Sequence, residues 1–195
     1  MTMRPMPAAL VLMAMLWACL LAALPARADG VEAAAAVCAA CHGADGVPAN
    51  KSIPVIWGQN EGYLYLELRD YKTGNRKNVT MSGLVGGLDK PAMKALAAYF
   101  AAKPWPNLQQ PSAAPPVATH VDSINNSAGC KGCHMENWQG DSVTPRLAGQ
   151  GVQYLRETMT RFRSGERVNN PWMVALLKTY SDQDIDDIAK FLSGY

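Results

Sequence analysis

The hydrophobic pattern of this chain repeats in two stretches that lie about 91 positions apart. Each stretch places apolar residues at the three- and four-residue spacing of a helix face. The first consists of Tyr63, Leu64, Leu68 and Tyr71, and the second of Tyr154, Leu155, Thr158, Met159 and Phe162. Gly74 and Gly165 follow these stretches and are typical of helix ends. The pattern therefore predicts one amphipathic helix in each half of the chain.

Further helices are expected before and after these two. An alanine-rich, helix-favouring stretch covers residues 31–41, and the second half is expected to open with a helix at 121–133. Asp89 and Ser181 stand where the N-cap of a closing helix would lie in each half. No segment alternates apolar and polar residues in the manner of a strand. The predicted fold class is therefore all-α.

Motifs outside the helices repeat with the same period. Pro54-Val-Ile-Trp-Gly58-Gln59 pairs with Pro145-Arg-Leu-Ala-Gly149-Gln150, and Tyr71-Lys-Thr-Gly74-Asn-Arg76 pairs with Phe162-Arg-Ser-Gly165-Glu-Arg167. Five prolines in residues 103–116 are typical of an extended, semi-rigid spacer. We therefore expect an internal duplication, with a first domain at 29–103, a linker at 104–118 and a second domain at 119–195.

The N-terminal segment indicates export. Arg4 precedes an uncharged apolar run over residues 8–24, which Pro25 and then Ala26-Arg27-Ala28 follow. This order is typical of a secretory signal peptide. We expect residues 1–28 to be cleaved after Ala28 and the protein to reach the periplasm. An uncleaved anchor is the alternative, because 17 apolar residues are close to the lower limit for crossing a bilayer.

Cleavage there makes the chain formally neutral. Of its 18 Lys and Arg residues, two lie in the first 28 positions, which leaves 16 basic against 16 acidic side chains. This balance argues against a nucleic-acid partner, and a membrane is expected only through partner proteins. Two clusters of charge in the second half are expected to face solvent. They are Arg156, Arg161, Arg163 and Arg167, and Asp182, Asp184, Asp186 and Asp187.

The five cysteines carry the candidate chemistry. Cys19 leaves with the signal peptide, and the other four stand in Cys38-Ala-Ala-Cys41-His42 and Cys130-Lys-Gly-Cys133-His134. Two disulfides or a zinc site are ordinary uses of four exported cysteines, but neither requires a histidine directly after each pair. A zinc ribbon also has its second pair about 15–20 residues later, whereas residues 42–129 separate these pairs.

C-x-x-C-H is the attachment signature of c-type haem. Its two thiols reach the vinyl groups of one porphyrin, and the adjacent imidazole is held under the iron. We therefore predict two covalent haem c groups. The thioethers are assigned to Cys38, Cys41, Cys130 and Cys133, and the first axial ligands are His42 and His134.

The repeat also predicts the opposite axial ligands. Met81 lies 39 positions after His42, Met173 lies 39 positions after His134, and no other methionines match between the halves. A thioether opposite a histidine is typical of electron-transfer haems with a raised potential. Lining the pocket without bonding the iron is the alternative for both residues. The residues not expected to bind iron are Met93, Met135, Met159 and His120, the last of which is expected to be solvated.

Together, the two motifs, the repeated Pro…Gly-Gln…Tyr-Leu…Gly-x-Arg…Met pattern and the Pro-rich linker resemble the dihaem cytochrome c4 family over residues 31–193. The resemblance implies two class I cytochrome c domains around a pseudo-twofold axis, with haem propionates close enough for electrons to pass between the irons. It also implies that the carbonyls of Pro54 and Pro145 accept hydrogen bonds from His42 and His134 and so orient the imidazoles. An ordinary chain turn is the alternative role of the prolines.

The two halves differ before their methionines. Lys77-Asn-Val-Thr80 precedes one, and Val168-Asn-Asn-Pro-Trp172 precedes the other. We therefore expect the two irons to have different potentials. Trp172 could shield a haem edge, but packing is the expectation.

These features predict a one-electron carrier with no catalytic residue, because an iron with both axial positions filled has no open site for a substrate. The resemblance implies that electrons arrive from a quinol-oxidising complex or a dehydrogenase and leave to a terminal oxidase. The main alternative is the electron-accepting subunit of a dehydrogenase, such as a flavocytochrome c sulfide dehydrogenase. A dihaem enzyme, either a peroxidase or a thiosulfate-oxidising haem protein, is a third interpretation. Neither the partner nor the oligomeric state follows from the sequence.

Overall fold

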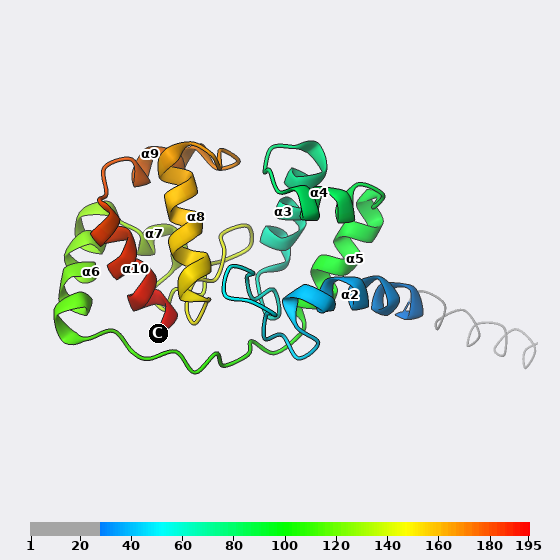
Figure 1. Ribbon diagram of the computed structural model, residues 1–195, viewed down its shortest axis with the longest axis horizontal. Coiled ribbons are helices and arrows are strands. Elements are labelled where there is room, and N and C mark those ends of the chain that lie inside the picture. Colours follow the sequence, from blue (N-terminus) through cyan, green and yellow to red (C-terminus); the bar gives the residue numbers. More distant parts are fainter. Residues whose placement is uncertain (1–27) are drawn as a thin grey trace, which may run out of the picture.

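The computed structural model describes residues 28–195, which form two groups of helices joined by an extended segment (Figure 1). The first group consists of α2 (Ala28–His42), α3 (Glu61–Thr73), α4 (Val79–Val85) and α5 (Lys90–Ala101). The second consists of α6 (Pro115–Ala128), α7 (Lys131–His134), α8 (Val152–Ser164), α9 (Pro171–Leu177) and α10 (Asp182–Ser193). Apart from one isolated bridge between Asp141 and Thr144, residues 28–195 contain no β structure. The all-α prediction is confirmed.

The structure describes little of the N-terminal segment, for which the sequence predicted a signal peptide or, as the alternative, a membrane anchor. The predicted signal peptide lies outside the described residues except for Ala28. Among residues 28–195, no helix combines the length and the apolar run that crossing a membrane requires.

The amphipathic helices end at the predicted glycines. Gly74 follows α3 with φ of 79°, and Gly165 follows α8 with φ of 77°. Both values lie in the left-handed region, which glycine adopts without the steric cost that a side chain brings. Asp89 and Ser181 cap the closing helices α5 and α10, each accepting a hydrogen bond from the backbone N–H three residues later. The local sequence therefore determines where these elements begin and end.

The opening of the second half differs from the prediction of one helix over 121–133. Gly129 adopts a left-handed conformation with φ of 68° and ends α6 after Ala128. The chain then resumes as the single turn of α7, which carries Cys133 and His134. At its other end α6 begins at Pro115, inside the segment expected to be linker, because proline suits the first turn of a helix.

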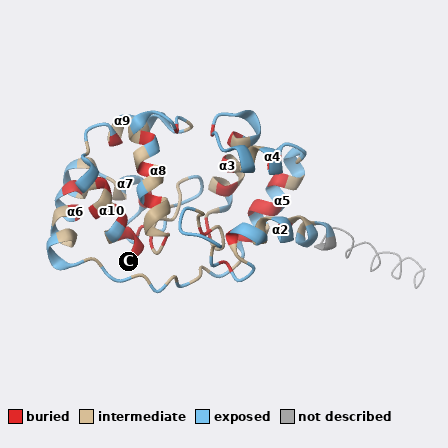
Figure 2. Ribbon diagram, viewed as in Figure 1, coloured by how far each residue is buried: buried red, intermediate tan, exposed pale blue. Residues whose placement is uncertain are grey.

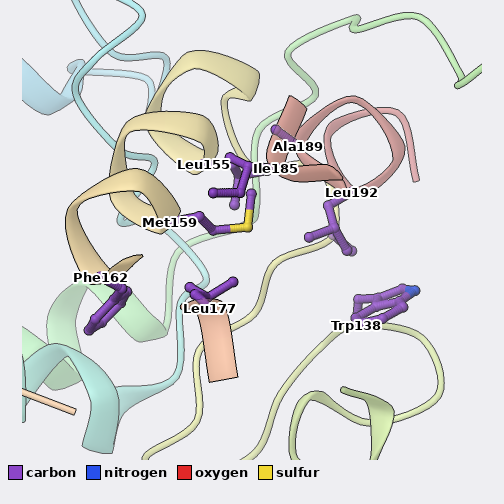
Figure 3. Packing of buried hydrophobic residues seen from close by; sticks show 9 residues of the cluster. Trp138, Leu155, Met159, Phe162, Leu177, Ile185, Ala189 and Leu192 are labelled. Atoms are coloured by element: carbon purple, nitrogen blue, oxygen red, sulfur yellow. The ribbon is translucent and has the colours of Figure 1, made fainter. Parts of the chain in front are cut away.

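Each half packs around its own apolar core, visible as buried stripes along α3, α5, α8 and α10 (Figure 2). The buried residues of the first core are Ala35, Leu64, Leu96, Ala97 and Phe100. Those of the second are Trp138, Ala148, Leu155, Met159, Phe162, Leu177, Ile185, Ala189 and Leu192, most of them shown in Figure 3. Both cores are small for a free-standing domain, and the first, with two alanines among five residues, is the smaller.

The extended segment after α5 lies against the second half instead of spanning open solvent. Gln110 donates to the carbonyl oxygens of Gln150, at 3.0 Å, and Ser193, at 3.1 Å. Its own side-chain oxygen accepts from the backbone N–H of Val152 at 2.9 Å. Arg146 stacks over the Trp105 ring with its guanidinium carbon 4.3 Å from the ring centroid. The prolines keep the segment extended, while these contacts fix where it runs.

The charged residues of the two clusters lie at the surface as predicted, except for Arg167 and Asp187, and some of them also pair across helices. Arg156 pairs with Asp186, and Arg163 pairs with Asp182, so that both pairs link α8 to α10. Arg167, which was predicted to face solvent with the other three arginines of its cluster, is buried.

His120 is likewise not simply solvated. It projects from α6 with its ring nitrogens 3.1 Å from Asp184 and 3.0 Å from Asp187, both on α10. Its side chain is 41% exposed, so the residue bridges two helices at the surface. It plays no part in the candidate sites below.

Candidate haem sites

The first site is built at the C-terminal end of α2. Cys38 and Cys41 lie one helical turn apart, with His42 as the last residue of the helix. The ring nitrogen Nδ1 of His42 lies 2.8 Å from the carbonyl oxygen of Pro54. A carbonyl can only accept, so Nδ1 carries the proton and Nε2 keeps a free lone pair. Burial lowers the pKa of His42, although the bond to Pro54 opposes this, so the ring is held in the neutral form that binds iron.

The second site has the same arrangement, but its motif lies on the short helix α7 instead of at the end of a long helix. Cys130 precedes α7, and Cys133 and His134 lie within it. Nδ1 of His134 lies 3.1 Å from the carbonyl oxygen of Pro145, and burial lowers the pKa of His134 as well. None of the four cysteines Cys38, Cys41, Cys130 and Cys133 is paired in a disulfide, so each is available for a thioether bond to a porphyrin.

The two methionines predicted as ligands lie on short helices that the sequence reading missed. Met81 lies on α4, where the side chain of Asn78 accepts from the Met81 N–H at 2.9 Å. Met173 lies on α9, where Asn170 accepts from the Met173 N–H at 3.1 Å. The shared Asn-x-x-Met pattern was the available signal, because asparagine is among the preferred N-caps. Each half therefore places a partly buried thioether at the first turn of a capped helix.

Buried indole groups give a test of whether a haem fits these sites. Within residues 28–195, the Nε1–H groups of Trp57, Trp105 and Trp138 are buried and have no hydrogen-bond partner. Buried donors are normally paired, so each such group calls for an explanation. Trp57 follows Pro54 by three residues, and Trp138 follows His134 by four. In each half, two thiols, an imidazole with a free Nε2 and a buried indole donor without a partner fit haem c. In the second half, Met173 also packs against the same core as Cys130.

Trp172 does not pack as predicted. It occupies the first turn of α9, directly before Met173, and is 85% exposed. The equivalent stretch of the first half exposes Val79, at 94%, in the first turn of α4. The side chains that differ most between the methionine segments therefore face outward.

A buried polar cluster joins the two halves, and its central carboxylate, Glu67, was not among the residues predicted from the sequence. Arg76 donates to Glu67 at 2.6 Å, and Arg167 donates to the same carboxylate at 2.5 Å. Arg76 and Arg167 hold equivalent positions, whereas Glu67 corresponds to Thr158 in the other half. The break in the repeat at this position was the signal for an asymmetric contact between the halves.

Two tyrosine hydroxyls complete this polar cluster. Arg76 donates to Tyr154 at 3.2 Å, and Arg167 donates to Tyr63 at 3.4 Å. Burial by itself would raise the pKa of Tyr154, but Arg76 and Arg167 outweigh it and lower that pKa to about 8. Burial raises the pKa of Tyr63. The guanidinium groups of Arg76 and Arg167 favour the ionised form of Tyr154, whereas the carboxylate of Glu67 opposes it.

Close backbone approach also joins the halves. The N–H of Tyr63, at the start of α3, donates to the carbonyl of Ser142 at 3.1 Å. A Cβ on Gly62 would lie 2.8 Å from that carbonyl oxygen, so only glycine fits there without a shift. Asn60 donates to the carbonyl of Thr144 at 2.7 Å. The start of α3 and the loop between α7 and α8 therefore meet between the two helix groups (Figure 1).

Comparison with known proteins agrees with this architecture. The Cytochrome c family profile matches residues 122–194. The chain is 34% identical to cytochrome c4 from Azotobacter vinelandii, over 82% of this chain and 85% of that protein. It is 31% identical to the thiosulfate dehydrogenase electron acceptor from Stutzerimonas stutzeri (strain A1501), over 85% of this chain and 82% of that protein.

A solved structure is similar over both halves. The crystal structure of reduced recombinant cytochrome c4 from Pseudomonas stutzeri matches with a TM-score of 0.75 at 29% identity. The match covers 85% of this chain and 97% of that structure. The fold of residues 28–195 is therefore the class I cytochrome c fold, present twice.

Proposed function

The chain belongs to the cytochrome c4 family of dihaem electron carriers, and on that premise we propose that it carries electrons in the periplasm from a quinol-oxidising complex or a dehydrogenase toward a terminal oxidase. Two haem c groups are bound covalently to the chain, one in each half. The proposed division is a signal peptide at 1–28, domains at 29–103 and 119–195, and a linker at 104–118. The observation that carries the proposal is the pair of matched donor sets, each with a buried histidine, a partly buried methionine and two cysteines that form no disulfide.

In the proposed assignment, Cys38, Cys41, Cys130 and Cys133 form the thioethers. The axial pairs are His42 with Met81 and His134 with Met173. When bound, each haem supplies one-electron exchange between Fe(III) and Fe(II). The chain orients each imidazole through the proline carbonyl, and the indole N–H of Trp57 or Trp138 would be free to donate to a carboxylate of a bound porphyrin. With both axial positions filled, no coordination site remains for a substrate, which favours electron transfer over catalysis at the metal.

Removal of one predicted ligand at a time tests the assignment. Met81→Ala and Met173→Ala should each remove about half of the sulfur-to-iron charge-transfer absorption of the oxidised protein and open one haem to cyanide. Met93→Leu is the matched control, since Met93 is buried within the first half and is not a predicted ligand. Unchanged absorption in either ligand variant would reject that methionine. Cyanide binding by one haem of the unaltered protein at low concentration would favour the enzyme interpretation.

The dehydrogenase-linked role has one specific observation in its favour. The similarity to a thiosulfate dehydrogenase electron acceptor covers most of both chains. We therefore propose, as the second candidate, that this chain accepts electrons from a dehydrogenase of that kind, in a lasting complex or a transient one. A terminal oxidase has no such named counterpart among the relatives reported above.

Native isolation separates a free carrier from a subunit. Haem absorbance would be followed through mild size-exclusion chromatography of an extract of the native host. Elution at the size of a single chain would support a diffusible carrier, and oxidase reduction assays would follow. Co-elution with a larger flavin, molybdenum or quinone protein would support the subunit role and would point to the substrate.

A further inference from the structure

Two glutamine side chains reach from one half of the chain to the other. Each of them bonds both the backbone N–H and the backbone carbonyl of one residue there. Gln150, in the second half, accepts from the N–H of Val55 at 2.9 Å and donates to the carbonyl of Val55 at 3.0 Å. Gln59, in the first half, accepts from the N–H of Arg146 at 2.7 Å and donates to the carbonyl of Arg146 at 3.0 Å. Each glutamine is 3% exposed. The contact is therefore a buried exchange of four hydrogen bonds between equivalent positions.

The peptide groups held in this way are the ones that bind the histidines. The carbonyl of Pro54 and the N–H of Val55 belong to one planar peptide unit. That carbonyl accepts from Nδ1 of His42, while the N–H at the other end of the unit donates to Gln150. An unbroken chain of hydrogen bonds thus runs from His42 through one peptide unit to a side chain of the opposite half.

The same chain of bonds runs in the other direction. Nδ1 of His134 bonds the carbonyl of Pro145, and the N–H of Arg146 in that peptide unit donates to Gln59. The peptide unit Pro145–Arg146 therefore lies between a histidine of its own half and a glutamine of the other. Both directions use the same atoms at equivalent positions of the repeat.

Glutamine suits this position because its amide offers one acceptor and donors that match a backbone C=O and N–H pair. Local bonds hold each side chain in place. The oxygen of Gln59 also accepts from the N–H of Asn60, and that of Gln150 from the N–H of Gly151, both at 2.9 Å. Each side-chain carbonyl therefore has two donors, and its orientation is determined by the bonds it makes.

We propose that Gln59 and Gln150 are positioning residues that act across the interface, each on the axial histidine of the opposite half. This inference rests on the proposed ligation of iron by His42 and His134. Donation from the peptide N–H polarises the peptide unit and strengthens the carbonyl as an acceptor. A stronger bond from Nδ1 raises the basicity of the imidazole, which favours Fe(III) and lowers the reduction potential. Each half therefore tunes the iron of the other.

The test is a pair of variants with opposite expected patterns in the intact two-haem protein. Gln150→Leu removes the bonds to Val55, and Gln59→Leu removes those to Arg146. In the reduced protein, the Nδ1–H proton of each axial histidine would be followed by NMR. Gln150→Leu should speed solvent exchange of the His42 proton about fivefold and leave that of His134 within about twofold, since a net hydrogen bond contributes about 1 kcal/mol. Gln59→Leu should do the reverse.

A second readout is the pair of midpoint potentials. The potential of the haem in the opposite half should rise in each variant, while that of the haem in the same half should stay unchanged. Gln153→Leu is the matched control, because Gln153 also crosses the interface but bonds Ser52, at 2.8 Å, and not Val55. Gln150→Asn, which keeps the amide but shortens the side chain, is the second variant should Gln150→Leu not fold.

The outcomes separate this inference from the proposed function. If the unaltered reduced protein lacks the ring-current-shifted methyl signals of bound methionine, the proposed ligation fails before any variant is compared. If those signals are present, the crossed pattern supports the inference. Faster exchange at the histidine of the same half, equal change at both histidines in both Gln150 variants, or no change at either would overturn it.

Discussion

Arg167 of the second half donates to the carboxylate of Glu67 in the first half at 2.5 Å, and the two side chains are only 6% and 12% exposed. Arg76 approaches the same carboxylate from within the first half. The buried carboxylate of Glu67 is thus the counter-ion of two guanidinium groups, one from each half, and it joins the halves. Because a buried charge without a partner is costly, this contact should contribute to stability out of proportion to its size.

Replacing Glu67 tests this contribution. Glu67→Gln leaves Arg76 and Arg167 buried without their counter-ion and should lower the free energy of unfolding by about 3 kcal/mol. Urea unfolding followed by far-UV circular dichroism measures this difference. Glu61→Gln, on the same helix but exposed, should change stability by no more than about 0.5 kcal/mol. An equal loss in both variants would contradict the role given to Glu67.

The tyrosine beside these arginines predicts a pH dependence. The pKa of Tyr154 is lowered to about 8 in the folded protein, against about 10 in an unfolded chain. Between these values the folded state binds fewer protons, so this group adds stability as pH rises toward about 10 and loses it as pH falls through about 8. Urea midpoints at about pH 7 and pH 9.5 should therefore diverge between the unaltered protein and Tyr154→Phe.

Tyr195→Phe is the control for that comparison. Tyr195 is exposed at the C-terminus, and its variant should follow the unaltered protein at both pH values. Identical responses of the unaltered protein and Tyr154→Phe would contradict the predicted ionisation.

The asparagine caps predict local effects on the methionines. Asn170→Ala should destabilise the start of α9 by about 1 kcal/mol, so that the Met173–iron bond is lost at a lower denaturant concentration. The charge-transfer absorption would be followed through the denaturant titration. Asn78→Ala should act in the same way on Met81. Asn170→Ser keeps a capping oxygen and should behave nearly as the unaltered protein, whereas a loss as large as that of the alanine variant would argue against capping.

Removal of the haems should unfold the chain. The first core has five buried apolar residues, and two of them are alanine, which is little for a domain of this size. Protein produced without haem attachment should therefore lack native helix content in far-UV circular dichroism. Native helicity in that protein would show that the apolar cores alone support the fold.

Much of the fold could be read from local sequence because local interactions determine it. The helix ends at Gly74 and Gly165 follow from glycine in the left-handed region, and the caps at Asp89 and Ser181 follow from side chains that bond their own backbone. The predicted helix over 121–133 is wrong at Gly129, which ends α6 although the apolar pattern alone would continue it. Helices α4 and α9 were not predicted, because a helix of seven residues is too short to show a periodic apolar pattern.

The candidate chemistry of this protein can be predicted from the order of its residues alone: two C-x-x-C-H motifs, a duplicated unit, and methionines at matched distances from the histidines. These are properties of spacing along the chain, and no folding is needed to see them. The contacts between the two halves could not be predicted from these patterns and are seen only in the folded structure. The contacts of Arg167 with Glu67 and of Gln150 with Val55 join residues about 100 positions apart. The physical reason is that such pairs depend on the packing of two separate units, which leaves no periodicity in either one.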